Sequence, residues 1–166
     1  MGLVDTLMVG RLGPAAIAAT GMGSGVFTAI VIFGMGLMLG LDTLVSQSAG
    51  AGRLDECLRW LHHGIVLALL VAPFVMALTW VAFLTIDAWG LNPEIGALAG
   101  PYLQVIASSA APLLLYAGLR RYLQGIHVVR PVMYALVTAN VVNAGANAIL
   151  IYGRFGMPAL GVTGSA

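Results

Sequence analysis

Charged side chains are scarce in this sequence, and lysine is absent altogether. Charged residues make up 8% of the 166 positions, whereas roughly a quarter of the residues in soluble domains are charged. This composition excludes a water-soluble fold. The net charge is only +1, and no basic run has interleaved aromatic residues, so a nucleic-acid partner is excluded as well.

Cysteines and catalytic side-chain sets are also lacking. Cys57 is the only cysteine, so an intrachain disulfide is impossible and we expect a small buried thiol. No serine has the histidine and aspartate neighbours of a nucleophile, and no cysteine–histidine cluster has metal-ligand spacing. We therefore expect no enzyme, no cofactor and no metal centre apart from the Na⁺ site considered below.

Long uncharged stretches are what the sequence has in abundance. Hydrophobic residues make up 60% of the sequence, and charged residues divide it into uncharged stretches at regular intervals. A membrane-spanning helix needs about 20 apolar residues, and no alternating pattern of barrel strands is present. We predict an all-α, polytopic transmembrane helical bundle with spans at 15–40, 60–85, 98–119 and 131–152.

The two ends of the chain carry shorter apolar segments. Residues 2–12 are enough for roughly 16 Å of helix, about half of a bilayer core, so we predict half of a span there. Residues from 161 onwards resemble the start of a sixth helix. We expect a chain that is truncated at both ends.

The distribution of arginine predicts the orientation in the membrane. The loops predicted at 42–59 and 120–130 carry five of the seven arginines, whereas the loop at 87–94 carries only Asp87 and Glu94. Arginine is favoured in cytoplasmic loops, although the other two arginines run against this bias. We predict a multi-pass protein of the cell inner (plasma) membrane with a cytoplasmic N-terminus.

Polar side chains within the predicted spans are the candidate functional residues. Asn140, Asn143 and Asn147 lie at i, i+3 and i+7, so a helix gathers them into one stripe, with Thr138 nearby. Asp5 is the one carboxylate expected inside a span, where it costs about 2.5–3.5 kcal/mol on insertion scales. Such groups face a cavity or a partner, so we predict that these residues line a polar cavity.

Simpler interpretations of the same residues stay open. Asp5 could pair with Arg11 or lie near a frayed terminus. Interhelical amide hydrogen bonds average about 0.6 kcal/mol in membranes and often only hold helices together. Small-residue pairs such as Gly21 with Gly25, and Gly36 with Gly40, predict close helix packing without any ligand.

Several segments together resemble one family of membrane transporters. They cover essentially the whole chain in order: Val4–Gly13, Gln47–Arg53, Leu119–Gly125, Arg130–Met133 and Asn143–Val162. In these segments the sequence resembles the MATE (multidrug and toxic compound extrusion) family. The resemblance implies a partial six-helix N-terminal lobe over 1–166, with the C-terminal lobe of the same protein as a missing partner. Arg121 stands where small residues are usual in the family, and the sequence offers no interpretation of it.

The resemblance also implies a function and a site. The family's membrane aspartate falls on Asp5, and its polar pair falls on Asn143 and Asn147. These residues would bind the coupling ion, H⁺ or Na⁺, while the protein exports drugs or toxic organic compounds, often cationic. The alternatives are a truncated, non-transporting scaffold and a lipid-linked oligosaccharide flippase, which should carry more basic residues within its spans.

Overall fold

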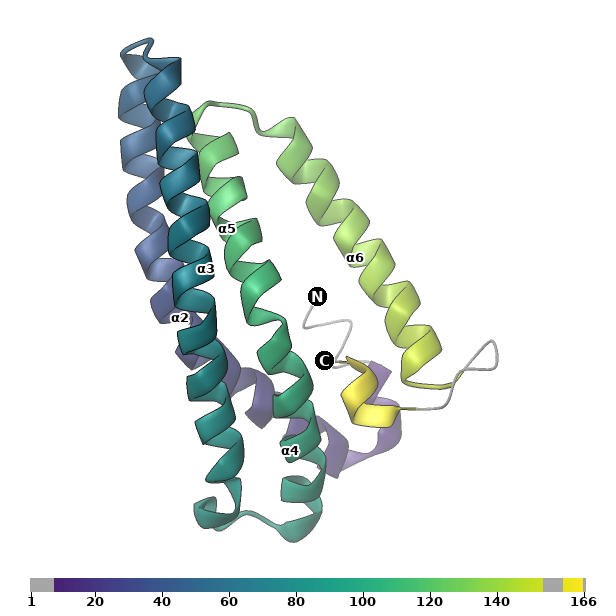
Figure 1. The fold of residues 1–166 in the computed structure, drawn as a ribbon. Helices are drawn as coiled ribbons and strands as arrows, with labels where there is room; N and C mark the ends of the chain where they lie inside the picture. The colour runs from purple at the N-terminus through teal and green to yellow at the C-terminus, as the bar shows by residue number, and fades with distance from the viewer. Residues whose placement is uncertain (1–7, 154–159, 166) are drawn as a thin grey trace. The chain divides into compact units, whose positions relative to one another are not determined.

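The computed structural model describes residues 8–153 and 160–165, and every regular element in them is a helix (Figure 1). This confirms the predicted all-α fold class. In chain order the elements are η1 (Gly10–Leu12), α2 (Pro14–Gly50), α3 (Leu54–Leu84), η2 (Ile86–Trp89), α4 (Pro93–Ser108), α5 (Ala110–Gly125), α6 (Arg130–Leu150) and η4 (Gly161–Ser165).

Three of the described helices are long and apolar enough to cross a membrane, namely α2, α3 and α6. The number rises to four if α4 and α5, which pass the test only together, form one span. At about 1.5 Å per residue, even the 21-residue α6 reaches roughly the 30 Å of a bilayer core. The chain is therefore a multi-pass membrane protein.

Helix α2 continues ten residues beyond the predicted end of its span, so Asp42 lies on a helix rather than in a loop. The helix ends in a Schellman motif, in which Arg53 N–H donates to Ser48 O (2.9 Å) and Gly52 N–H donates to Ala49 O (3.0 Å). Gly52 adopts a φ of 72°, which glycine tolerates without a Cβ clash. The loop expected at 42–59 is thus a short turn, and Arg120 and Arg121 likewise lie on α5 and not in a loop.

The stretch predicted as one span at 98–119 is divided between α4 and α5. Pro112 explains the division, because its ring clashes with the carbonyl of Ser108 and its nitrogen cannot donate a hydrogen bond. Helix α5 resumes at Ala110, where Pro112 occupies the first turn. Pro73, by contrast, lies within α3 without ending it.

The described residues form two compact units. Unit 1 comprises those of 1–28, 79–107 and 136–166, and unit 2 comprises 29–78 and 108–135. The core of unit 1 contains two clusters of buried side chains: Val9, Ala16, Tyr102, Ile151 and Val162 in one, and Ala19, Ile86, Ala99 and Leu103 in the other. In unit 2, Cys57 is buried as expected and its thiol lies 3.7 Å from Val45 O.

Glycines allow close packing of helices within unit 2, but they are not the predicted ones. A Cβ added to Gly125 on α5 would lie 2.7 Å from Val45 on α2, and one added to Gly64 on α3 would lie 2.7 Å from Leu41. The pairs predicted from small-residue spacing, Gly21/Gly25 and Gly36/Gly40, are exposed and have no described atom within 4 Å of a Cβ. Among the described residues these pairs therefore make no close helix contact, because the spacing alone does not tell which face of a helix meets its neighbour.

An ion pair joins α2 to α5 within unit 2. Arg121 Nη1 donates to Asp42 Oδ2 across 2.6 Å, and each side chain is about one-third exposed. The two residues lie 79 positions apart in the sequence. This contact gives Arg121 the structural role that the sequence could not supply.

Replacing Gly125 by alanine should destabilise the protein, because the new methyl group overlaps Val45. We expect the free energy of unfolding to fall by about 1–3 kcal/mol, measured by thermal unfolding of the protein in detergent. The matched control, Gly36→Ala, meets open space and should be neutral or stabilising by up to about 1 kcal/mol. Equal stability of the two variants would contradict this packing.

The ion pair should appear as a coupling energy in a double-mutant cycle. For Asp42→Asn, Arg121→Gln and the double variant, we expect a coupling of about 1 kcal/mol, since both groups keep some access to solvent. Unfolding of the purified variants in detergent provides the measurement. A coupling energy of zero would mean that the contact adds no stability.

Candidate functional site

The asparagine stripe lies on α6, an uninterrupted helix from Arg130 to Leu150. Pro131 stands in its first turn, where the missing N–H would have no intrahelical acceptor in any case. The helix therefore keeps its period through Asn140, Asn143 and Asn147, as the sequence predicted.

Burial of the three amides increases along the stripe. Asn140 is exposed, and its Nδ2 donates to Leu136 O of its own helix at 2.8 Å. Asn143 is half-buried, and Asn147 is only 3% exposed. The strongest candidate for a polar site is thus the end of the stripe nearest to the C-terminus of α6.

Asn143 carries a buried acceptor without a hydrogen-bond partner in the described part of the chain. The atom is its amide oxygen, Oδ1. Leaving a buried acceptor unsatisfied costs about 1–3 kcal/mol. A carbonyl-type oxygen is also a hard ligand suited to a small cation.

Thr138 does not share this stripe. It lies nine positions before Asn147, which is about two and a half turns of helix, so the two lie on opposite sides of α6. Thr138 is exposed. Thr138 is therefore not next to the buried amides, although it is close to them in the sequence.

The C-terminal end of α6 is held by contacts within unit 1. Tyr152 Oη donates to Met8 O at 2.7 Å, a contact between residues 144 positions apart. Leu160 N–H donates to Leu150 O at 2.9 Å, and Gly164 of η4 packs so closely that an added Cβ would lie 2.8 Å from Leu150 O. These contacts fix the helix end just beyond Asn147.

Asp5, the predicted carboxylate, lies outside the described residues, as does most of the half span predicted at 2–12. The described chain begins with Met8 and Val9 in helical conformation, followed by η1. Where a sixth helix is expected from 161, the described residues form the five-residue 3₁₀ helix η4. The structure thus describes the asparagines of the predicted site and not its acid.

A second polar feature was missed in the sequence. Glu56, Arg59, Trp60 and His63 on α3 line a cavity of about 320 Å³. Their spacing of i, i+3, i+4 and i+7 was the available signal, because it places all four on one face of a helix.

Comparisons with known proteins agree on one family. The family model described as MatE matches residues 1–149. The chain is 30% identical to the multidrug resistance protein NorM of Photobacterium profundum and 34% identical to the multidrug resistance protein MdtK of Cronobacter sakazakii. Each match covers 99% of this chain and 36% of the relative, so the chain spans about a third of the length of these relatives.

A solved structure has the same fold. The chain superimposes on a MOP superfamily transporter from Pyrococcus furiosus with a TM-score of 0.81 at 23% identity, over 99% of this chain and 36% of that one. The helices, their order and the family match over most of the chain lead to one conclusion: this chain belongs to the MatE (MATE) family of membrane transporters, whose members are not enzymes.

Proposed function

We propose that the chain works as part of a secondary active antiporter that exports drugs or other toxic organic compounds, often cationic. The observation that carries this proposal is the amide pair on a helix of a MATE-family chain, with Asn147 buried and the Oδ1 atom of half-buried Asn143 out of contact with solvent. The names of the relatives NorM and MdtK, both multidrug resistance proteins, support the substrate class.

Asp5 and the two amides would bind the coupling ion. A carboxyl group away from water is neutralised by a proton or by a cation. Asp5 together with the oxygens of Asn143 and Asn147 would supply part of the cage for Na⁺, or Asp5 alone would take up H⁺. The open acceptor of Asn143 is available to such an ion.

A contact near the end of α6 supports a site shared with the first span. Met8, three positions after Asp5 in the sequence, accepts a hydrogen bond from Tyr152, which follows α6.

Ion binding would drive transport by changing the packing of the first span against α6. A charged and a neutral Asp5 favour different packings, so the ion shifts the balance between inward-open and outward-open states. We place the protein in the plasma membrane with a cytoplasmic N-terminus. The C-terminal lobe would complete the path for the substrate.

Asp5→Asn in the full-length protein should abolish drug resistance while membrane expression persists, because the amide cannot gain or lose a proton or balance a cation. Asp87→Asn, at an exposed acid of η2, is the control and should keep full resistance. Drug efflux from cells with the H⁺ and Na⁺ gradients collapsed one at a time would identify the coupling ion. Resistance retained in Asp5→Asn would remove this acid from the mechanism, and efflux insensitive to both gradients would contradict coupling to H⁺ or Na⁺. No efflux with both gradients intact would favour a non-transporting scaffold.

Asn147→Leu should reduce efflux at least tenfold, since it removes a buried amide from the proposed site. Asn140→Leu makes the same chemical change at an exposed position of the same stripe and should leave efflux within about twofold of normal. Initial efflux rates at matched expression provide the measurement. Equal losses in the two variants would show that burial on α6 does not select the functional amides.

A further inference from the structure

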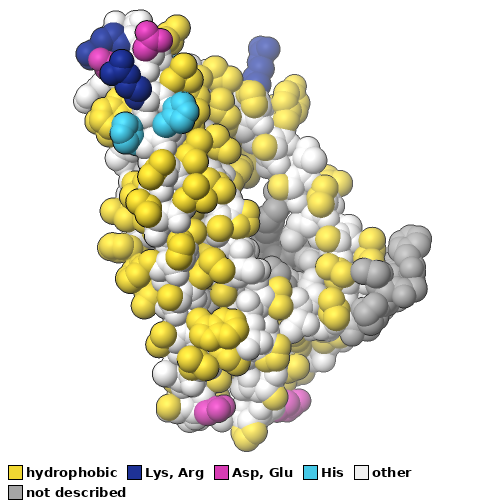
Figure 2. All heavy atoms as spheres, in the orientation of Figure 1, with side chains coloured by type: hydrophobic (Ala, Val, Ile, Leu, Met, Phe, Trp, Pro, Cys, Tyr) yellow, Lys and Arg dark blue, Asp and Glu magenta, His cyan; other side chains and the backbone are white. Residues whose placement is uncertain are grey.

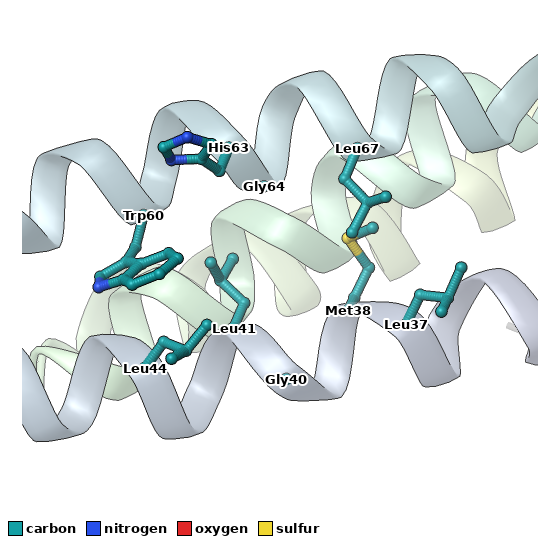
Figure 3. A pocket seen from close by; sticks show the side chains of 9 residues that line it. All are labelled: Leu37, Met38, Gly40, Leu41, Leu44, Trp60, His63, Gly64 and Leu67. Atoms are coloured by element: carbon teal, nitrogen blue, oxygen red, sulfur yellow. The ribbon is translucent and has the colours of Figure 1, made fainter.

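A groove runs along the outside of α2 and α3 in unit 2 (Figure 3). It encloses about 180 Å³ between apolar side chains of both helices, with Trp60 and His63 at one end. We call it the α2–α3 groove and define it by Leu37, Gly40, Leu41, Leu44, Trp60 and Leu67. Such a groove on two membrane-spanning helices has the shape and polarity to hold a hydrocarbon chain.

The groove continues into a more polar cavity. Trp60 and His63 line both, and the cavity adds Arg59 and Glu56. Figure 2 shows charged and histidine side chains gathered at this end of α2 and α3, with hydrophobic side chains covering the face beyond them. The site as a whole is therefore amphipathic, with an apolar trough and a charged end.

The charged end has a free cation. Arg59 is exposed and makes no ion pair with a described carboxylate, whereas Glu56 already accepts from Arg53 (2.9 Å) and Ser48 (3.2 Å). The partners of Glu56 offset its charge locally. Arg59 is left as the group in this cavity that can receive an anion.

The neighbouring rings complete the polar end. His63 Nδ1 lies 2.7 Å from Arg59 O, and because a carbonyl only accepts, Nδ1 carries the hydrogen and Nε2 of the neutral ring is left as an acceptor, suited to a hydroxyl group and not to a phosphate oxygen. The ring of Trp60 lies 5.7 Å from that of His63 and lines the apolar trough as well. Tryptophan, like tyrosine, is enriched where membrane hydrocarbon meets headgroups.

We propose that the α2–α3 groove binds one anionic phospholipid, with its phosphate at Arg59, a headgroup hydroxyl at His63 Nε2 and one acyl chain along Leu41, Leu44 and Leu67. An apolar trough that leads into a cationic end, on helices of membrane-spanning length, matches this ligand in both polarity and charge. The proposal does not depend on the transport activity proposed above.

Lipid titration of the delipidated full chain in detergent, followed by native mass spectrometry, tests this site. The wild type should bind one palmitoyl-oleoyl phosphatidylglycerol more tightly than phosphatidylcholine. Arg59→Gln should weaken phosphatidylglycerol binding about fivefold and leave phosphatidylcholine unchanged. Arg130→Gln, at an exposed arginine that begins α6, is the control and should change neither.

A second pair of variants tests the apolar trough. Gly40→Leu fills the groove, since a Cβ there meets no described atom, and should weaken both lipids roughly tenfold by displacing about two methylene groups. Gly36→Leu is equally exposed on α2 but does not line the groove, so it should bind both lipids normally. Gly40→Ala serves as a milder variant if the leucine disturbs folding.

Three results would overturn the proposal. The first is equal lipid affinity of Arg59→Gln and Arg130→Gln, and the second is equal affinity of Gly40→Leu and Gly36→Leu in samples with unchanged helix content. The third is a wild-type dimer that retains no lipid and that Gly40→Leu dissociates. In that case a second copy of the chain, and not a lipid, would cover the groove.

Discussion

The cost of placing a polar group in hydrocarbon is the constraint on which the rest of this structure depends. Without water, such a group needs an internal partner or a ligand. Asp42 meets Arg121, and the amide of Asn140 donates to its own helix. The amide oxygen of Asn143 is buried with no partner in the described part of the chain. Asp42 and Asn140 thus already have partners, whereas the amide oxygen of Asn143 is open to an ion.

Close backbone packing is the second consequence of a lipid environment. Apolar side chains gain little from meeting each other when lipid tails are equally apolar, so small residues and tight contacts stabilise the helix pairs. Gly64 and Gly125 provide such contacts within unit 2. The glycines that face open space have a different consequence, because Gly40 leaves room for the trough of the α2–α3 groove.

The existence of the helices could be predicted from the sequence, but several of their ends could not. Uncharged stretches of more than 20 residues predict membrane spans whatever their partners are. Charged residues are expected to mark loops, but Asp42 and Arg121 lie on helices, where they offset each other's charge across a contact between residues 79 positions apart. The break before Pro112 follows from local sterics, whereas Pro73 shows that proline alone does not determine it.

The stripe of asparagines on α6 could also be predicted, since it needs only the helical period. The gradient of burial from Asn140 to Asn147 could not, because it depends on residues that meet in the fold and not on the helical period. Around the end of α6, Tyr152 bonds to Met8, Ile151 shares a core cluster with Val9, and Gly164 packs against Leu150. The cavity at Trp60 shows the same limit. Its spacing on α3 was visible in the sequence, but the apolar trough that it opens into is formed with α2.

The most direct test of a cation site shared by Asp5 and the amides is infrared difference spectroscopy of the full-length protein, recorded with and without Na⁺ and across neutral pH. A carboxyl band that vanishes in Asp5→Asn should respond to the ion or to pH, and Asn147→Leu should shift it while Asn140→Leu should not. An Asp5 band that ignores both ions, or that is indifferent to the loss of Asn147, would contradict the account.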